Sequence, residues 1–262
     1  MVWPRVAGDL RKAIVRPEDY SEYAERPLEF LQERLGFFPD VHQAKIFDQH
    51  VHRGLLLCTR QFGKSTTLAA VAVHRACVEP GSLVVVVSPT ARQSGEFLTK
   101  ASLFLDRLGI GKKTDGVHAL SRVLPNGSRI LGLPDVEATV RGYSARLVLV
   151  DEASRVCDEV MTAVRPMLAA TNGDLWMITT PAGKRGMFYR EWVGDGRWFR
   201  LKVTAPECGR ILTSFLDEER QAHGDLKFRQ EYLCEFVDTH ERVFEEDWIQ
   251  AMLVDDGEPL KI

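Results

Sequence analysis

Long hydrophobic runs are missing from this 262-residue sequence. No stretch reaches about 18 consecutive apolar residues, the length that a membrane-spanning helix requires. The amino terminus, Met1–Arg5, also lacks the apolar core of a secretory signal peptide. Both absences argue against a membrane protein and lead us to expect an intracellular one.

Cysteine is scarce, and its spacing indicates no metal site. The sequence has five cysteines, an odd number, and none of them form a Cys-x-x-Cys pair. Zinc sites are normally recognised by such short spacings. We therefore predict small buried thiols rather than zinc ligands. The five residues are Cys58, Cys77, Cys157, Cys208 and Cys234.

An overall excess of positive charge is also missing. The chain carries 34 Lys and Arg residues against 37 Asp and Glu residues, a formal net charge of −3. A protein whose whole surface binds nucleic acid usually carries a basic excess, so this class is disfavoured. The charge is uneven, however, because residues 92–129 hold seven basic and three acidic side chains. A local basic face that contacts DNA remains compatible with the sequence.

What the sequence does contain is an alternation of short apolar strands with helices. Strands that are apolar throughout must be covered on both faces, so the alternation predicts an α/β fold with a mostly parallel sheet flanked by helices. A helical region over 20–36 precedes the first strand. The predicted strands are 54–58, 83–87, 147–150 and 175–178, and the predicted helices are about 64–77 and 92–108.

Two further parts of the chain have their own pattern. Pro125–Ser128 contains Asn-Gly between two short apolar segments, which predicts a β-hairpin. From about residue 183 onward the elements are shorter, which suits a small subdomain packed beside the sheet. We expect a core over 1–182, which includes the helical region, and a lid and linker over 183–262. The elements predicted in the second part are a strand over 198–203 and helices over 214–223 and 226–232.

A phosphate-binding loop is indicated between the strand at 54–58 and the helix that follows. Gly63, Lys64 and Ser65 lie where the N–H groups of a helix start can face an anion. Lys64 would reach the β- and γ-phosphates of a nucleotide, and the Ser65 hydroxyl would hold Mg²⁺. Cys58 stands where such motifs usually have their first glycine. The other loop residues expected around the phosphates are Gln61, Phe62 and Thr66.

Arg60 is an unusual residue inside this loop. One interpretation is a solvated surface charge. The other is a guanidinium placed near the γ-phosphate, where its fixed fork would neutralise developing negative charge. The sequence leaves both open.

An acidic pair follows the apolar strand at 147–150. Open α/β sheets bind ligands at the carboxyl ends of their strands, so Asp151 and Glu152 are expected at the same edge as the phosphate loop. Asp151 would hold the hydration shell of Mg²⁺, and Glu152 would polarise the attacking water. The alternative is a pair of exposed acids that cap the next helix.

Three smaller features support nucleotide chemistry. The Gln43 amide can pair with the donor and acceptor edge of adenine. Thr179 and Thr180 end the strand after the acidic pair, where hydroxyl groups could sense a γ-phosphate. Arg141 begins an Arg-Gly-Tyr sequence shortly before the acidic strand. ATP and Mg²⁺ are therefore the predicted ligands.

Together these motifs resemble the terminase large subunit family of tailed bacteriophages. The resemblance extends from Gln43 to Trp248, and its most specific elements are the arginine inside a glycine-poor loop and the Arg-Gly element. It implies a RecA-like P-loop ATPase that drives double-stranded viral DNA into a procapsid. The segments that carry it are 60–65, 141–145, 150–153 and 179–181.

The resemblance also implies roles for single residues. Gln43 would contact adenine, Glu152 would be the catalytic carboxylate, and residues 179–181 would couple hydrolysis to movement. Some members supply an arginine finger to the neighbouring subunit, and Arg141 matches that element. The competing finger is Arg60, acting within its own subunit, and we slightly favour Arg141.

The expected partners also follow from the resemblance. They are double-stranded DNA, a portal protein, a small terminase subunit and further copies of the chain in a ring, by family resemblance a pentamer. The motor would work in the host cytoplasm, docked on the procapsid. DNA phosphates would be contacted by basic residues, which could equally be solvated surface charges. The candidates are Lys112, Lys113, Arg122 and Arg129, on a loop and a hairpin that could project into the pore of the ring.

Two other functions share part of this motif set. Helicases of the DEAD-like class have a glutamine motif, a Gly-Lys-Ser/Thr loop and an Asp-Glu pair, but residues 183–262 are too few for their second RecA-like domain. A nucleotide-dependent switch would have little use for Glu152. Family members normally also carry a nuclease domain, and the acids at 255–258 are better explained as linker. We therefore expect an isolated ATPase domain without nuclease activity.

Overall fold

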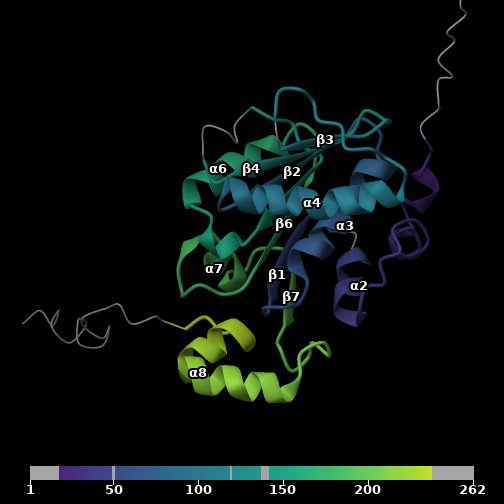
Figure 1. Cartoon of the computed structure of the whole chain (residues 1–262). Helices are drawn as coiled ribbons and strands as arrows, with labels where there is room; N and C mark the ends of the chain where they lie inside the picture. The colour runs from purple at the N-terminus through teal and green to yellow at the C-terminus, as the bar shows by residue number, and fades with distance from the viewer. Residues whose placement is uncertain (1–17, 49–50, 119, 137–141, 238–262) are drawn as a thin grey trace, which may run out of the picture.

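The computed structural model describes residues 18–48, 51–118, 120–136 and 142–237, with a seven-stranded sheet at its centre (Figure 1). The strand order is β3-β4-β2-β5-β6-β1-β7. Every neighbouring pair is parallel except β3 with β4. The strands are β1 (Arg53–Cys58), β2 (Leu83–Ser88), β3 (Ser121–Val123), β4 (Arg129–Pro134), β5 (Leu147–Asp151), β6 (Asp174–Thr179) and β7 (Phe199–Val203).

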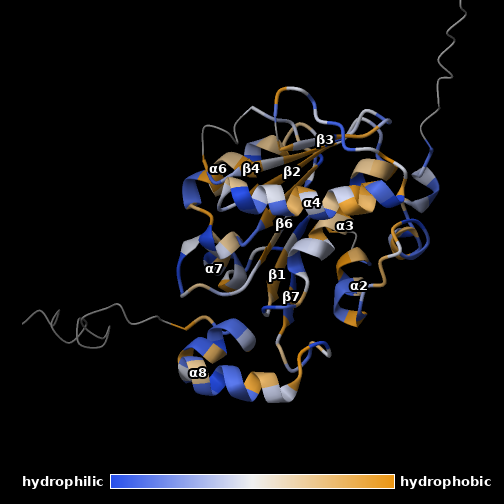
Figure 2. Cartoon of the chain, viewed as in Figure 1, coloured by the Kyte–Doolittle hydropathy of each residue, from blue (hydrophilic) through white to orange (hydrophobic). Residues whose placement is uncertain are grey.

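Helices cover both faces of the sheet, as uniformly apolar strands require. In β2, Val84 and Val86 pack with α3 (Lys64–Val78) and α4 (Ala91–Arg107). Val85 and Val87 point to the other face. That face is covered by α6 (Asp158–Met167) and α7 (Gly186–Val193). Figure 2 shows hydrophobic strands between helices of mixed polarity. The sequence-based prediction of the sheet and of its first two helices is confirmed.

Short helical pieces precede the sheet. The predicted helical region at 20–36 consists of η1 (Ser21–Tyr23), α1 (Pro27–Glu29) and η2 (Phe30–Arg34). The sequence did not predict α2 (Val41–Phe47), which spans only seven residues. Its start is fixed by a capping box, in which the Asp40 side chain accepts from the Gln43 N–H and the Gln43 side chain accepts from the Asp40 N–H.

The carboxy-terminal part of the described chain also contributes to the sheet. β7 pairs with β1, so residues after 182 contribute a strand to the core as well as helices. α8 (Thr213–Tyr232) bends at Gly224, whose φ of 76° and ψ of 165° are not helical. Its two halves correspond to the two predicted helices. The division into a core and a lid at residue 182 stays a prediction.

The predicted hairpin is present, with β3 at the edge of the sheet and β4 between β3 and β2. One expectation needs correction. Cys157 is exposed, whereas the other four thiols are buried. It occupies the position before α6, where its backbone N–H and thiol contact Asp135. No helix in the described residues is long and apolar enough to cross a membrane.

Candidate functional site

The turn between β1 and α3 is shaped by one glycine and one phenylalanine. Gly63 lies immediately before α3 with a φ of 84°, a left-handed conformation that glycine adopts without strain. The Phe62 side chain is fully buried in the core and anchors the loop there. No side chain caps this helix start. Its first N–H groups are therefore available to an anion.

Lys64 points back across the loop. Its Nζ donates to the Thr180 hydroxyl at 2.8 Å and to the Thr59 carbonyl oxygen at 3.2 Å. The Thr180 hydroxyl in turn donates to the Cys58 carbonyl oxygen at 3.2 Å. β1 and β6 are parallel neighbours, so their carboxyl ends bring the loop and the threonines together as predicted. Thr179 is buried, and its hydroxyl accepts from the Ser154 N–H at 3.2 Å.

The two acids lie at the end of β5, on the same edge of the sheet. Asp151 is only 6% exposed, and it hydrogen-bonds the Ser65 hydroxyl. Burial raises its pKa, and the Ser65 hydrogen bond and the nearby Lys64 charge oppose that rise. Burial also raises the pKa of Glu152, whose φ of 53° is unusual for a residue with a side chain. Such a backbone costs roughly 1–3 kcal/mol, which is typical of functional sites.

These groups surround a cavity of about 370 Å³. Four basic side chains and two acidic ones line it, so the cavity suits a polyanion. The predicted residues in its lining are Arg60, Gln61, Gly63, Lys64, Ser65, Glu152 and Thr180. The residues that sequence reasoning missed are Gln93, Lys100, Arg155 and Glu231.

Arg60 is paired with a residue from the far end of the described chain. Its Nε donates to the Glu231 carboxylate at 2.6 Å, which raises the pKa of the Arg60 guanidinium. Lys227 contacts the same carboxylate at 3.0 Å. Burial works to raise the pKa of Glu231, but these two cations outweigh burial and lower it. The Arg60 side chain is half-exposed, but the Glu231 side chain that it pairs with is buried. Arg60 is therefore held in place by the fold and is not a freely solvated loop charge.

Gln43 lies behind the loop and does not line the cavity. Its Nε2 donates to the Phe62 carbonyl oxygen at 3.0 Å, and its Oε1 accepts from the Asp40 N–H at 3.1 Å. One N–H and one lone pair of the amide remain for another partner. Thr66 lies half-buried in the first turn of α3. Arg141 lies outside the described residues.

The donor set fits Mg²⁺. Among the described residues, no group of three or more His, Cys, Asp or Glu side chains could hold a metal on its own. Mg²⁺, however, is usually held by one or two carboxylates together with phosphate oxygens and water. The buried Asp151 carboxylate beside the Ser65 hydroxyl supplies such a partial site.

The four basic residues predicted to touch DNA differ in their surroundings. Lys112 and Lys113 are exposed. The Arg122 guanidinium donates to the Ser102 hydroxyl at 2.6 Å, and Arg129 pairs with Asp115 at 3.5 Å. The two arginines therefore serve contacts within the fold.

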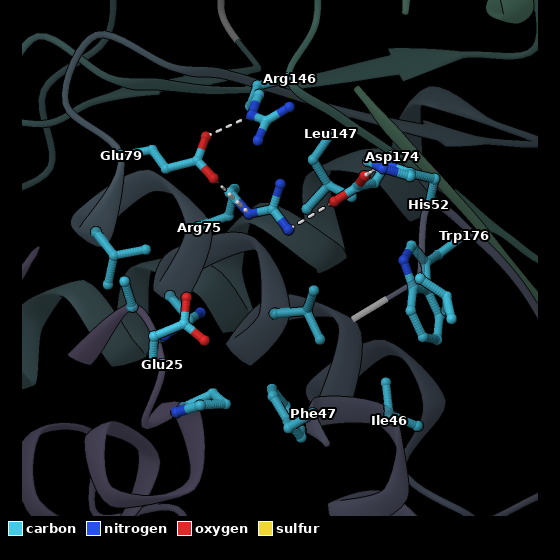
Figure 3. A pocket seen from close by; sticks show the side chains of 16 residues that line it. Glu25, Ile46, Phe47, His52, Arg75, Glu79, Arg146, Leu147, Asp174 and Trp176 are labelled. Carbon is cyan, nitrogen blue, oxygen red and sulfur yellow. Dashed lines mark hydrogen bonds and ion pairs between the residues drawn. The ribbon is translucent and has the colours of Figure 1, made fainter. Parts of the chain in front are cut away.

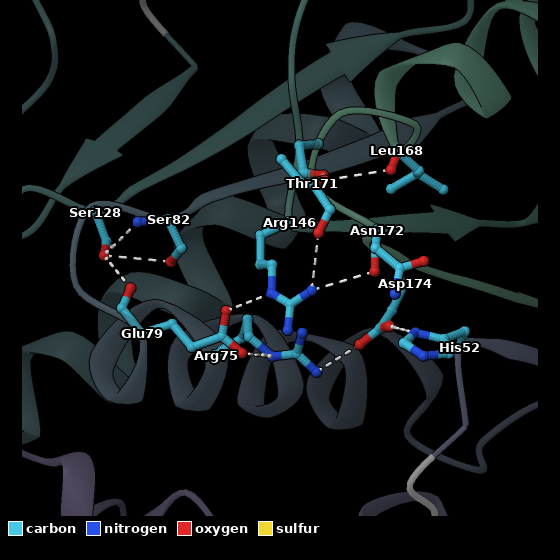
Figure 4. A network of polar contacts seen from close by, with 11 residues as sticks. His52, Arg75, Glu79, Ser82, Ser128, Arg146, Leu168, Thr171, Asn172 and Asp174 are labelled. Atoms are coloured by element: carbon cyan, nitrogen blue, oxygen red, sulfur yellow. Dashed lines mark hydrogen bonds and ion pairs between the residues drawn. The ribbon is translucent and has the colours of Figure 1, made fainter.

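A second cavity of about 370 Å³ lies at the amino-terminal edge of the sheet (Figure 3). Apolar side chains including Phe47 and Trp176 line one side, and ion pairs line the other. Arg75 near the end of α3 contacts Asp174 at the start of β6 at 2.7 Å (Figure 4). Arg146 contacts Glu79 at 2.7 Å. These opposite charges compensate one another, so the network ties α3 to the starts of the strands.

The family model and the curated relatives that match this chain are all terminase large subunits. Residues 55–251 match the family model described as "Terminase large subunit, T4likevirus-type, N-terminal". The large terminase subunits of Thermus phage G20c and Thermus virus P23-45 are each 26% identical to this chain, over 84% of it and 53% of their own length. The chain spans about half the length of the curated relatives it matches.

Solved structures share the fold. The ATPase domain of the large terminase from Thermus phage P74-26 has a TM-score of 0.73 and 23% identity, over 81% of this chain and 99% of that domain. The large terminase of another thermophilic bacteriophage, in complex with ADP, has a TM-score of 0.64 and 12% identity, over 75% of this chain and 53% of that one. The predicted RecA-like arrangement is thereby confirmed.

Proposed function

This chain belongs to the terminase large subunit family, and we propose that it is the ATP-hydrolysing motor part that drives double-stranded viral DNA into a procapsid. One observation carries the proposal. The helix start at Lys64, the Thr180 hydroxyl and the Asp151–Glu152 pair meet at one edge of a parallel sheet, around a basic cavity. This is the set of groups that phosphoryl transfer requires.

In this proposal the loop residues hold the phosphate tail of ATP. The N–H groups that follow Gly63 and the Lys64 ammonium face the β- and γ-phosphates. The Ser65 hydroxyl and the Asp151 carboxylate are the groups that would hold Mg²⁺, which neutralises phosphate charge when bound. The Thr180 hydroxyl accepts a hydrogen bond from Lys64. A phosphate that draws the ammonium away would therefore change the contacts of the residue that follows β6.

Glu152 would orient and polarise the attacking water. Its left-handed backbone turns the side chain out of the strand direction, and the side chain lines the cavity. The carboxylate must be ionised to accept a proton. Arg60 lines the same cavity and is anchored by Glu231, so its guanidinium is placed for a γ-phosphate in its own subunit.

Arg141 is the arginine finger that we favour for the neighbouring subunit. The residues that follow it, Gly142–Ser144, line a cavity with Ser82 and Leu83 at the start of β2. They therefore lie at the sheet edge opposite Asp151. Arg141 itself lies outside the described residues, and its role in trans rests on the family resemblance, in which a ring of copies, by family likeness a pentamer, brings one subunit's finger to the next subunit's nucleotide.

The family implies packaging partners. We propose that the motor acts on double-stranded DNA together with a portal protein and a small terminase subunit, in the host cytoplasm and docked on the procapsid. Lys112 and Lys113 are the better candidates for phosphate contacts, because both are exposed. Such contacts are independent of sequence and weaken with salt.

ATP turnover with and without DNA tests the proposal. Lys64→Ala should lower kcat by about 10²–10³-fold, because a preorganised charge on the phosphates is lost. Glu152→Gln should lower it by about 10²–10⁴-fold. Lys45→Ala and Glu22→Gln change exposed side chains and serve as matched controls. Unchanged turnover in both site variants would refute the proposal, and strand displacement by the wild type would favour a helicase.

A further inference from the structure

The segment between β7 and α8 carries an arginine that reaches the back of the phosphate loop. Arg210 Nη1 donates to the Phe62 carbonyl oxygen at 3.1 Å, and its Nη2 forms an ion pair with Asp40. The segment passes below α2 in Figure 1. Arg210 thus links the loop to the start of α2, although 148 residues separate it from Phe62.

Asp40 and Gln43 complete a closed set of hydrogen bonds with Arg210. The Asp40 carboxylate accepts from the Gln43 N–H at 2.8 Å, and the Asp40 N–H donates to Gln43 Oε1 at 3.1 Å. Gln43 Nε2 then donates at 3.0 Å to the same Phe62 carbonyl oxygen that Arg210 contacts. Gln43 is 2% exposed, and the hydrogen bonds at both ends of its amide favour one orientation.

The arrangement is tight and charged. A Cβ atom on Gly63 would lie 3.1 Å from Arg210 Nη1 and 3.2 Å from Gln43 Nε2, so the two side chains leave little room for a larger residue at this position. Burial works to raise the pKa of Asp40, but hydrogen bonds from the Gln43 backbone and from Arg210 outweigh burial and lower it. The carboxylate consequently remains ionised and holds the fork of Arg210.

We propose that Arg210 is a positioning residue for base selection, which holds the Gln43 amide in the orientation that accepts adenine and rejects guanine. The proposal rests on the proposed function. Adenine offers an N6 amino donor beside the N7 acceptor, whereas guanine offers O6 and N7, both acceptors. The free lone pair of Gln43 Oε1 pairs with the amino group of adenine but would face O6 of guanine.

The difference between adenine and guanine affects binding only if the Gln43 amide is held in one orientation. A glutamine that can rotate by 180° presents its NH₂ group where its oxygen was, and can then satisfy guanine O6. The hydrogen bonds through Asp40 and Phe62 oppose that rotation. Arg210 contacts Asp40 and the Phe62 carbonyl oxygen, so its loss weakens the support of both partners of the amide, while the side chains that line the phosphate cavity are unchanged.

A merely structural Arg210 would behave differently. If it only tied the segment after β7 to the core, its removal would lower the melting temperature and would affect ATP and GTP equally. A positioning residue changes the ratio of kcat/KM for the two nucleotides, and it acts through KM more than through kcat at saturating ATP.

The test compares hydrolysis and binding of ATP and GTP by the full chain as wild type, Arg210→Ala and Arg210→Lys. We expect the preference for ATP to fall by about tenfold in Arg210→Ala, the scale of one bidentate base contact. Lysine can satisfy Asp40 or Phe62 but not both, so Arg210→Lys should restore part of the preference. Arg220→Ala, which removes another exposed arginine ion pair, is the control.

A second variant covers failure of the alanine variant to fold. Asn caps helices as well as Asp, so Asp40→Asn keeps α2 while it removes the ion pair, and it should relax selectivity in the same direction. An unchanged ATP-to-GTP ratio in these variants, or an equal loss for both nucleotides, would overturn the positioning role alone. A wild type that binds neither nucleotide would overturn the proposed function itself.

Discussion

Asp151 keeps an ionisable carboxyl group almost completely out of water. Burial raises its pKa, so the folded protein favours the protonated form more than the unfolded chain does. For an acid with a raised folded-state pKa, the associated stability is present at low pH and is lost as the pH rises through that pKa. At neutral pH the folded state therefore bears a cost that bound Mg²⁺ would offset.

Asp151→Asn should consequently stabilise the protein while it abolishes activity. A gain of about 1 kcal/mol corresponds to roughly 2–4 °C in Tm for a chain of this size. The gain should be larger at about pH 7 than near pH 4, because the raised pKa leaves less of the wild-type carboxyl group ionised at the lower pH. Thermal denaturation at both pH values measures it, with Asp106→Asn as the exposed control. A gain that did not depend on pH would contradict the burial argument.

Glu152 gives a second prediction for single residues. Its pKa is raised by burial, and only the ionised form can accept a proton from water. The rate of ATP hydrolysis at saturating ATP should therefore rise with pH and level off, with an apparent pKa above that of an ordinary glutamate. Glu152→Gln should remove the slope together with the activity. A rate that falls as the pH rises from about 5 to 7 would be inconsistent with a general base.

α8 consists of two halves that meet at Gly224. The half after Gly224 carries Glu231, whose carboxylate holds Arg60 and whose carbonyl oxygen accepts from the Arg60 N–H and the Thr59 hydroxyl. The bend at Gly224 combines a φ of 76° with a ψ of 165°, a region open essentially to glycine alone. The bend therefore sets the direction of the first half of α8 relative to the half that carries Glu231.

Gly224→Ala should weaken this contact. A side chain there costs roughly 1–3 kcal/mol, or forces α8 to straighten and withdraw Glu231. We expect a lower Tm, together with a kcat that falls toward that of Glu231→Gln. Gly111→Ala, at a glycine with open space around it and no positive φ, is the control. Equal Tm values for the wild type and Gly224→Ala would show that the bend is not constrained.

Sequence reasoning succeeded where function depends on the ends of apolar strands. Lys64 and Asp151 are close because β1 and β5 are both parallel strands, and strand identity was readable from short apolar runs. Glu231 and Arg210 were missed because their contacts span 171 and 148 residues and depend on β7 lying beside β1. No local pattern encodes such a neighbour. The capping box at Asp40, by contrast, was a readable signal for α2.

At the scale of the whole molecule, the amino ends and the carboxyl ends of the parallel strands lie on opposite sides of the sheet. β5 has five residues, or about 16 Å at roughly 3.3 Å per residue, so Gly142–Ser144 and Asp151 lie well apart. Arg141 lies outside the described residues, and we propose that it acts on the nucleotide of another copy. In the proposed motor each catalytic site is complete only when another copy is present.

Turnover should then depend on protein concentration. We expect specific ATPase activity to rise steeply with concentration for the wild type and to stay low for Arg141→Ala, since a finger in trans contributes up to about 10³–10⁵-fold. Arg92→Ala changes another arginine, which is highly exposed, and should follow the wild type. A concentration-independent rate for both the wild type and Arg141→Ala would leave Arg60 as the sole finger.

An arginine finger that one copy supplies to the next has a further consequence for how copies associate. Contacts of this kind are head-to-tail and use two different surfaces, so symmetry does not stop them at a pair. The rotation from one copy to the next decides whether the series closes on itself or continues as an open spiral.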